Sequence, residues 1–359
     1  MPMREVEEKL PGPWETELSN QAGVSEKLRR IPIPREFHQK SNLKAAFLIL
    51  LHVAIILGCG PLAYAVHRWW AYALAFLLVG ARAQALYILQ HECMHWLLFT
   101  NKPVNTVVGV AISGLIGTRL FDGRRFHFKH HREVGGPTDP NMSWHDTKGR
   151  EPGWPAARFF MVQLLGSRLI GVAQRVLLLL NPQSRIRREK PSTSSAAREN
   201  RDRKEVMADM FSLLFSQALV FGFMTIVSSP WVYVFLFLLP IVTLTSFFEA
   251  IRAFSEHVLP GEIPTCPAEH KRLFYMDAPK WERFFISQFG FHYHHLHHLY
   301  PNIVTFKLQD LHRWLEIHDP DYQRKFIRRP GYVGTAVAYI FHRPVAGAGL
   351  HYPKVRGNA

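Results

Sequence analysis

The sequence predicts an all-α fold, an integral membrane four-helix transmembrane bundle with a cytoplasmic helical cap that carries clusters of histidines. Three observations predict this fold. Hydrophobic residues make up 48% of the 359 residues and aromatic residues 13%, and they are bunched rather than evenly spread. Four apolar runs approach the ~20 residues that a helix needs to cross the hydrocarbon core of a bilayer. The histidines gather in polar segments outside these runs.

The four predicted spans are residues 45–66, 69–90, 210–228 and 231–250. Only Ser-Pro signals around Pro230 separate the last two, which predicts a tight hairpin. Arg82 and Gln84 are costly in lipid, so they are expected to face protein, to snorkel, or to lie where the second helix already emerges. Pro240 is expected to kink the fourth span or to mark where it opens, because proline lacks a backbone N–H.

The segments outside the spans differ in character. Residues 104–118 are apolar but only about 15 long, which favours a re-entrant or interfacial helix, or one buried under the histidine-bearing part. Residues 1–42, with several prolines and mixed charge, are expected to form a cytoplasmic arm. Residues 260–280 are expected to be an extended connection, and residues 321–359 a C-terminal tail for which the sequence predicts no structure.

Charge predicts the topology. Lys and Arg are frequent before the first span and between the second and third, whereas the other two connections hold almost none. By the positive-inside rule, both termini and the histidine clusters are expected on the cytoplasmic side. The net charge of +15 comes without a nucleic-acid-binding motif, so basic flanks for lipid headgroups are favoured over nucleic acid. The three cysteines form no CxxC pair, which fits a reducing compartment.

The histidines form three clusters, at residues 91–95, 127–131 and 292–298. Residues three or four apart share one face of a helix, so each cluster can direct several imidazoles to the same point. Imidazole is the commonest metal ligand near neutral pH. Together the clusters exceed the capacity of one four-coordinate zinc site and indicate two transition-metal ions. The predicted ligands are His91, His95, His127, His130, His131, His294, His297 and His298, whereas His295 lies on another face and is left out.

On these clusters, which read HxxxH, HxxHH and HxxHH in order, the chain resembles the membrane-bound fatty acid desaturase superfamily of desaturases, alkane hydroxylases and carotenoid ketolases. The resemblance covers roughly residues 40–315 and defines a membrane desaturase-like domain at residues 43–320. It implies a non-haem centre of two iron ions, held by histidines, with O₂ as co-substrate. Relatives also use as a ligand the His of a Glu-His that follows an Arg, which here adds His257 as a ninth ligand.

Four further residues are candidates for supporting the metal. Arg252 and Glu256 lie four apart and can pair, which would orient His257. Asp139 follows the second cluster and either orients a ligand imidazole or serves as a turn former. Relatives carry an Asn that supports iron or its water near the place of Gly290 or His292. His292 therefore either replaces this Asn, or supports a ligand, or lies at the surface.

The resemblance implies a membrane O₂-dependent oxidoreductase. The spacing of the second cluster, with two residues before the HH pair, is that of desaturases and ketolases, so a fatty acyl desaturase that introduces a C=C bond is favoured. The alternative is a hydroxylase or ketolase of a lipid, a carotenoid or another hydrophobic metabolite. A metal-handling membrane protein is a remote alternative. Transport predicts metal ligands near the middle of the membrane, whereas the histidine clusters lie at the ends of the predicted spans or beyond them.

The expected partners follow from what the chain lacks. It contains no haem-binding His-Pro-Gly-Gly, no cysteine set for an iron–sulfur cluster and no nucleotide-binding glycine loop. A separate electron donor is therefore expected, either a ferredoxin or a cytochrome with its reductase. The other expected partners are membrane lipid and a hydrophobic or acyl-carrier-linked substrate.

Overall fold

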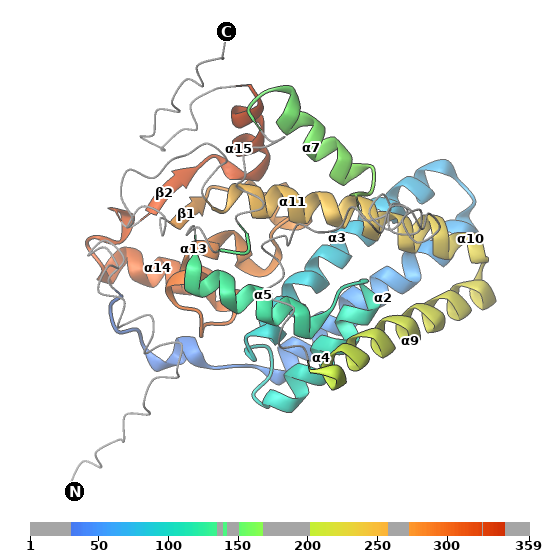
Figure 1. Ribbon diagram of the computed structural model, residues 1–359, viewed down its shortest axis with the longest axis horizontal. Coiled ribbons are helices and arrows are strands. Elements are labelled where there is room, and N and C mark those ends of the chain that lie inside the picture. The colour runs from blue at the N-terminus through green and yellow to red at the C-terminus, as the bar shows by residue number, and fades with distance from the viewer. Residues whose placement is uncertain are drawn as a thin grey trace, which may run out of the picture.

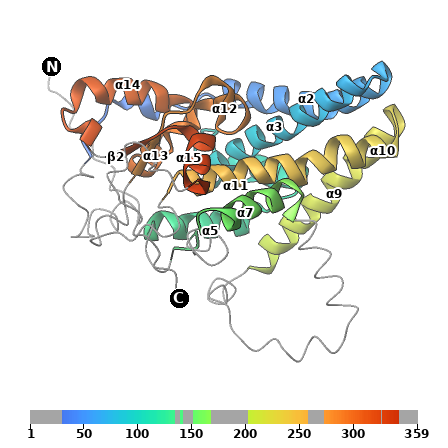
Figure 2. The same cartoon turned by 90° about the horizontal axis from the view of Figure 1, so that it is seen from above.

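The computed structural model describes residues 30–134, 139–141, 151–167, 202–257, 273–324 and 326–341, and most of them are helical. Most of the predicted N-terminal arm and the end of the predicted C-terminal tail lie outside these ranges. Within these ranges, four helices are long and apolar enough to cross a membrane: α2 (Asn42–Val66), α3 (Trp69–Met94), α9 (Arg203–Val227) and the continuous helix Pro230–Ser255. Each corresponds to one predicted span, and α9 ends one residue before its span does. They extend together to one side, and the shorter elements gather at the other end (Figures 1 and 2).

The four long helices form an inner and an outer pair. In the most apolar stretch of α3 and of the helix Pro230–Ser255, 61% of residues are buried, against 22% in α2 and 17% in α9. The outer helices expose large apolar side chains such as Phe47, Leu62, Phe211 and Ile226. An apolar exterior of this kind suits contact with lipid. The inner pair is therefore placed to carry polar groups, and α3 carries Arg82 and Gln84 inward.

These two polar residues face protein, as one of the predicted alternatives required. The Arg82 guanidinium donates to the carbonyl of Phe284 at 2.6 Å, and the residue is only 8% exposed. The Gln84 amide donates to a carboxylate oxygen of Glu249 at 3.2 Å and to the carbonyl of Ile286 at 3.3 Å. Both side chains thus tie α3 to segments more than 160 residues away in sequence.

The fourth span runs through Pro240 without a break. It comprises α10 (Pro230–Val232), the π-helical segments η4 (Tyr233–Leu238) and η5 (Ile241–Thr245), and α11 (Ser246–Ser255). Pro240 lacks an N–H and its ring excludes the preceding carbonyl, and the wider π-helical turns on both sides accommodate it. The Thr245 hydroxyl donates to the carbonyl of Gly80 at 3.0 Å and fixes this stretch to α3.

The short apolar segment forms α4 (Lys102–Leu115), which is followed by α5 (Leu120–Glu133) at a bend of 107°. Gly117, at φ +72°, lies in the bend, where a left-handed conformation is needed. Asp209 of α9 accepts from the backbone N–H groups of Leu120 at 3.0 Å and Phe121 at 3.2 Å. A carboxylate at a helix N-terminus satisfies free donors and the helix dipole, so α9 sets the direction of α5.

The remaining elements cover the end of the bundle. They are η2 (Arg35–His38), α7 (Trp154–Leu164), α12 (Lys280–Phe285), η7 (Gln288–Tyr293), α13 (His294–Leu299), η8 (Thr305–Lys307), α14 (Leu308–His318), η9 (Tyr322–Arg324) and α15 (Gly331–Ile340). Phe289 and Gly290 have positive φ values of 61° and 85° between α12 and α13. The third histidine cluster therefore starts a short helix of its own rather than continuing α12.

The all-α prediction is wrong in one detail, because the structure contains a two-stranded parallel sheet. Strand β1 (Leu273–Met276) pairs with β2 (Phe326–Arg329), with Leu273 opposite Phe326. Each strand has four residues, too few for an alternating pattern to stand out in the sequence. Their pairing depends on the intervening helices, which bring the two segments together. Residues 260–272 of the expected extended connection lie outside the described ranges.

Part of the predicted tail is packed into the fold. The strand β2 and helix α15 both follow residue 320, and Arg329, Tyr332 and Tyr339 are each at most 1% exposed. Helix α15 lies against α11 and α7 (Figure 1). These contacts bring the C-terminal segment to the end of the fourth span.

Candidate metal centre

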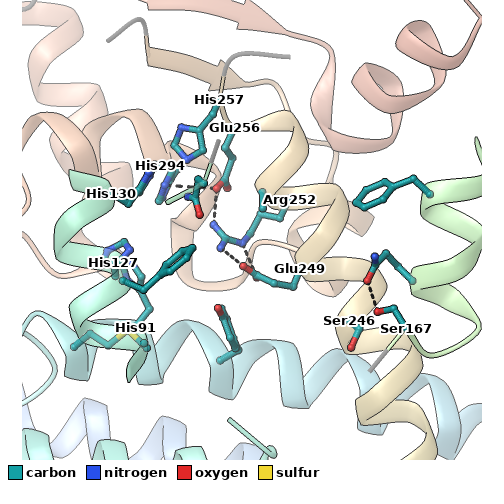
Figure 3. A pocket seen from close by; sticks show the side chains of 18 residues that line it. His91, His127, His130, Ser167, Ser246, Glu249, Arg252, Glu256, His257 and His294 are labelled. Carbon is teal, nitrogen blue, oxygen red and sulfur yellow. Dashed lines mark hydrogen bonds and ion pairs between the residues drawn. The ribbon is translucent and has the colours of Figure 1, made fainter. Parts of the chain in front are cut away.

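Four elements bring the nine predicted ligands to one place. Helix α3 supplies the first cluster near its C-terminal end, α5 supplies the second, the residues after α11 supply His257, and α13 supplies the third cluster. Figure 3 shows His91, His127, His130, His257 and His294 converging from these elements. Five of the nine form a first group, which consists of His91, His95, His127, His131 and His297. Two smaller sets share His257, one with His130 and His298 and the other with His294 and Glu256. Because the ring centroids of His294 and His298 are 4.5 Å apart, the four histidines of these sets, His130, His257, His294 and His298, make up a second group.

In the first group, ligand nitrogens from three elements lie within 4.8 Å of one another. The Nε2 atom of His127 is 2.7 Å from Nε2 of His95 and 2.9 Å from Nε2 of His131. Nε2 of His131 is 3.0 Å from Nε2 of His297. Two nitrogens bound at about 2.1 Å to one metal ion, at right angles, would be about 3.0 Å apart. The spacing is that of ligands around a shared ion.

In the second group, His257 packs between the other clusters. Its ring centroid lies 4.6 Å from that of His130, 5.2 Å from His298 and 5.5 Å from His294. Nε2 of His298 and Nε2 of His294 are 2.9 Å apart. His257 is only 5% exposed, so it lies inside the cluster rather than at the surface. The ring centroids of His131 and His298 are 4.4 Å apart, so the two groups adjoin.

The protonation state of the cluster suits a metal ion. Burial first, and neighbouring imidazoles second, lower the pKa values of His294, His297 and His298 well below the usual range for histidine. Burial and the Arg124 guanidinium lower the pKa of His95 to about 3. These rings are therefore neutral near pH 7 and present lone pairs, as metal ligation requires.

Carboxylates contact the Nδ1 atoms of two of these rings. Nδ1 of His130 lies 2.9 Å and 3.1 Å from the two carboxylate oxygens of Asp139, and Nδ1 of His91 lies 3.2 Å from Glu92. Nε2 of His91 and Nε2 of His130 are buried without a hydrogen-bond partner among the described residues. A ligand histidine commonly donates one N–H to a carboxylate and leaves the other nitrogen for the metal. These atoms therefore fit a metal centre.

Arg252 and Glu256 form the predicted pair. The Arg252 guanidinium donates to Glu256 at 2.5 Å and to Glu249 at 2.6 Å, and all three residues lie beside the histidines (Figure 3). A Glu256 carboxylate oxygen is also 3.6 Å from Nε2 of His294. Burial raises the pKa of Glu256 to about 8, against the opposing effect of the Arg252 charge. Glu256 therefore joins the ion-pair network directly to the second histidine group.

Two histidines of the third cluster lie outside both groups among the described residues. His295 is buried, with Nε2 3.2 Å from the Tyr322 hydroxyl, on a face away from the other ligands, as its spacing predicts. His292 is 2% exposed and packs against Tyr293 at a ring-centroid distance of 4.1 Å. The structure does not bring His292 into either group.

Sequence reasoning missed several residues that position the centre. Arg329 of β2 donates to the backbone carbonyls of Ser255 at 2.5 Å and His257 at 2.6 Å. Glu92, within the first cluster, accepts from the backbone N–H of Thr305 at 3.0 Å and so ties α3 to the segment after the third cluster. Glu92 could have been noticed from its place inside the cluster. No local pattern marks Arg329.

A cavity of about 550 Å³ opens onto the histidines. It is bounded by α3, α5, α7 and α11, and His91, His127, His130, His257 and His294 line its metal end. A substrate that enters this cavity would reach both histidine groups.

Comparisons with known proteins agree with this arrangement. The family model described as fatty acid desaturase matches residues 67–330. Dihydrorhizobitoxine desaturase of Bradyrhizobium elkanii is 25% identical over 295 residues, which cover 79% of this chain and 78% of that protein. The chloroplastic sn-2 acyl-lipid omega-3 desaturase (ferredoxin) of Helianthus annuus is 28% identical over 116 residues, 32% of this chain and 26% of that protein. The endoplasmic reticulum omega-3 fatty acid desaturase of Vigna radiata is 25% identical over 115 residues, 32% of this chain and 30% of that protein.

These relatives are named as desaturases, which indicates an oxidoreductase. The two plant proteins match only in part, so they support the family assignment but do not identify a substrate. The family match covers most of the chain and includes all nine converging histidines. The chain belongs to the fatty acid desaturase family of membrane proteins.

Proposed function

We propose that this protein is a di-iron, O₂-dependent desaturase that removes two hydrogens from adjacent carbons of its substrate. The observation that carries the proposal is the convergence of nine histidines from four elements into two adjoining groups. Five histidines would hold one iron ion, and four would hold the other, with Glu256 beside them. Imidazole-rich sites of this kind suit iron and leave positions open for O₂.

The bound irons would supply the oxidising chemistry, and the protein supplies position and electrostatics. Overall, O₂ takes up four electrons, two from the cleaved C–H bonds and two from a donor, and becomes two molecules of water. Asp139 and Glu92 hold ligand rings in orientation, and Arg252 and Arg329 hold the chain around Glu256 and His257. The buried histidines keep the reacting carbon away from bulk water.

The substrate candidates come from two kinds of relative. The plant relatives are named for omega-3 fatty acids, which supports a fatty acyl chain of a lipid. The bacterial relative, which matches over most of its length, is named for dihydrorhizobitoxine, which supports a different metabolite as a second candidate. Hydroxylation or ketolation stays an alternative outcome, because small shifts of the carbon relative to the irons decide between loss of hydrogen and gain of oxygen.

We propose that both termini and the metal centre face the cytoplasm, as the distribution of Lys and Arg predicts. Electrons would come from a separate donor, and the printed name of the Helianthus relative supports a ferredoxin. The chain's excess of basic residues would steer an acidic donor to the cytoplasmic face.

The test begins with metal analysis of the protein purified in detergent after growth in iron-replete medium. The expected result is about two irons per chain, with O₂ consumption driven by ferredoxin, its reductase and NADPH. Mass spectrometry of host lipids and soluble metabolites then looks for a loss of two daltons. Stoichiometric zinc, with no O₂ consumption after iron reconstitution, would reject the enzyme and favour metal handling.

A further inference from the structure

The end of the cavity away from the histidines is polar. Ser246 at the start of α11, Gln163 of α7 and Ser167 just after α7 line it there. The Ser167 hydroxyl donates to the Gln163 side-chain carbonyl at 2.6 Å. Figure 3 shows Ser246 and Ser167 at the same end of the cavity, with Glu249 and Arg252 between them and the histidines. The described cavity walls thus carry hydrogen-bonding groups at both ends and between them, beside apolar side chains such as Met94, Phe126 and Phe159.

The Ser246 hydroxyl is the most informative of these groups. A helical serine or threonine often donates to the carbonyl four residues back, as Thr243 does to Leu239 at 2.7 Å. Ser246 makes no hydrogen bond to any described residue, although it is only 5% exposed. A buried hydroxyl without a partner is costly. A ligand in the cavity that reaches Ser246 would remove this cost.

The middle of the cavity carries a charged pair. The Arg252 guanidinium contacts Glu249 through two nitrogens, at 2.6 Å and 3.0 Å, and Gln84 donates to the same carboxylate. A methylene chain lying against this pair would remove its water and offer no hydrogen bond in return. Ligand pockets are lined mainly by hydrophobic and aromatic side chains, and their few polar groups fix the orientation of the ligand. The polar groups of this cavity would be left without partners by a methylene chain, so they favour a ligand that carries polar groups of its own.

We propose that the substrate is a compact polar metabolite, with hydroxyl, amino or carboxylate groups at the end remote from the reacting carbon, rather than a long acyl chain. This inference rests on the proposed function, since the histidines define the reacting end. Ser246 and the Gln163–Ser167 pair bind the remote polar end, and the Arg252–Glu249 pair contacts the polar groups between. These residues determine specificity, whereas the histidine groups hold the metal.

The experiment uses the full-length, iron-loaded protein in detergent. The probes are octane, 1-octanol, 1,8-octanediol and 8-amino-1-octanol, which share a methylene centre and differ in their ends, and vesicles of stearoyl phosphatidylcholine. Binding is measured as the rise in thermal unfolding midpoint, and turnover as reductant-driven O₂ consumption. The expected result is stronger binding and faster O₂ consumption with the molecules that carry two polar ends than with octane or the lipid.

A variant isolates the polar end. Ser246→Ala combined with Gln163→Leu is expected to weaken binding of 1,8-octanediol by about fivefold to tenfold for each hydrogen bond lost, and to leave octane binding unchanged or improved. Thr225→Ala is the matched control, because it removes a hydroxyl that donates to the Phe221 carbonyl on α9, away from the cavity. The control is expected to behave as the unaltered protein.

The outcomes separate this inference from the proposed function. Two bound irons with tighter binding of octane or the lipid, and no effect of the double variant on the diol, would overturn the polar-substrate assignment and leave the desaturase proposal standing. Failure to bind iron or to reduce O₂ would reject the desaturase proposal and, with it, this assignment. If the double variant does not fold, the ranking of probes on the unaltered protein decides.

Discussion

The hydroxyl of Tyr332 donates a hydrogen bond of 3.0 Å to the carboxylate of Glu256, across 76 residues of sequence. Both side chains are buried. Tyr332 lies in the first turn of α15, whose backbone N–H groups at Tyr332 and Val333 donate to Glu282 at 2.8 Å and 2.9 Å. Since Glu256 precedes His257, the position of α15 fixes the end of α11 at the metal centre.

Replacing Tyr332 with Phe is expected to weaken the centre without removing a ligand. The change leaves one oxygen of Glu256 buried without its donor, which costs about 1–3 kcal/mol. The unfolding midpoint of the purified protein should fall, and the iron content should fall at limiting iron. Tyr64→Phe, on the exposed surface of α2, is the control and should change neither quantity. Unchanged iron binding in Tyr332→Phe would mean that α15 does not position the centre.

Replacing His257 with Ala tests the ligand that depends most on the resemblance. His257 packs against His130 and His298, so its loss should remove about one of the two bound metal ions and abolish turnover. His295→Ala is the matched control from the third cluster, because its ring contacts Tyr322 instead. That variant should keep both ions and lose only thermal stability. Two ions and normal turnover in His257→Ala would exclude His257 as a ligand.

The carboxylate of Asp139 offers a third test. Asp139→Asn keeps the shape of the side chain but removes the charge that faces Nδ1 of His130. Changes behind a ligand imidazole typically cost about 10–100-fold in metal affinity. Competition with a chelator of known affinity measures this loss. An unchanged metal affinity would mean that Asp139 only stabilises the turn, in which its carboxylate accepts a hydrogen bond from the backbone N–H of Asn141 at 2.8 Å.

The start of α15 should be intolerant of a side chain at Gly331. This residue has a φ of +75°, and an added Cβ would lie 2.5 Å from a carboxylate oxygen of Glu282. Gly331→Ala is therefore expected to lower the free energy of unfolding by roughly 1–3 kcal/mol. Gly334→Ala is the control in the same helix, where the nearest contact of the added Cβ is 3.4 Å, to Pro330. It should be neutral or stabilising, and equal losses in both variants would contradict the strain argument.

Much of the site could be predicted from local spacing. His91 and His95, or His294 and His298, share a helical face because of the 3.6-residue period, and no distant contact is needed for that. The four spans are similarly local, since they depend on apolar length alone. His295 lies outside both histidine groups for the same reason.

Other features had no local signal. The pairing of β1 with β2 and the contacts of Arg329 join segments more than 50 residues apart, so no pattern within either segment predicts them. The π-helical turns on both sides of Pro240 depend on how the inner helices pack. The absence of His292 from both histidine groups follows from the backbone turn at Phe289 and Gly290.

By itself, the sequence determined the membrane helices and the three histidine clusters, because apolar length and histidine spacing are properties of short segments. Only the tertiary structure decided how the ligands divide between two groups, which buried contacts hold His257, and how polar the cavity wall is. Those features come from side chains of α7, α11, α13 and α15, which meet only when the chain folds, and the free energy of such contacts depends on distance in space rather than along the chain.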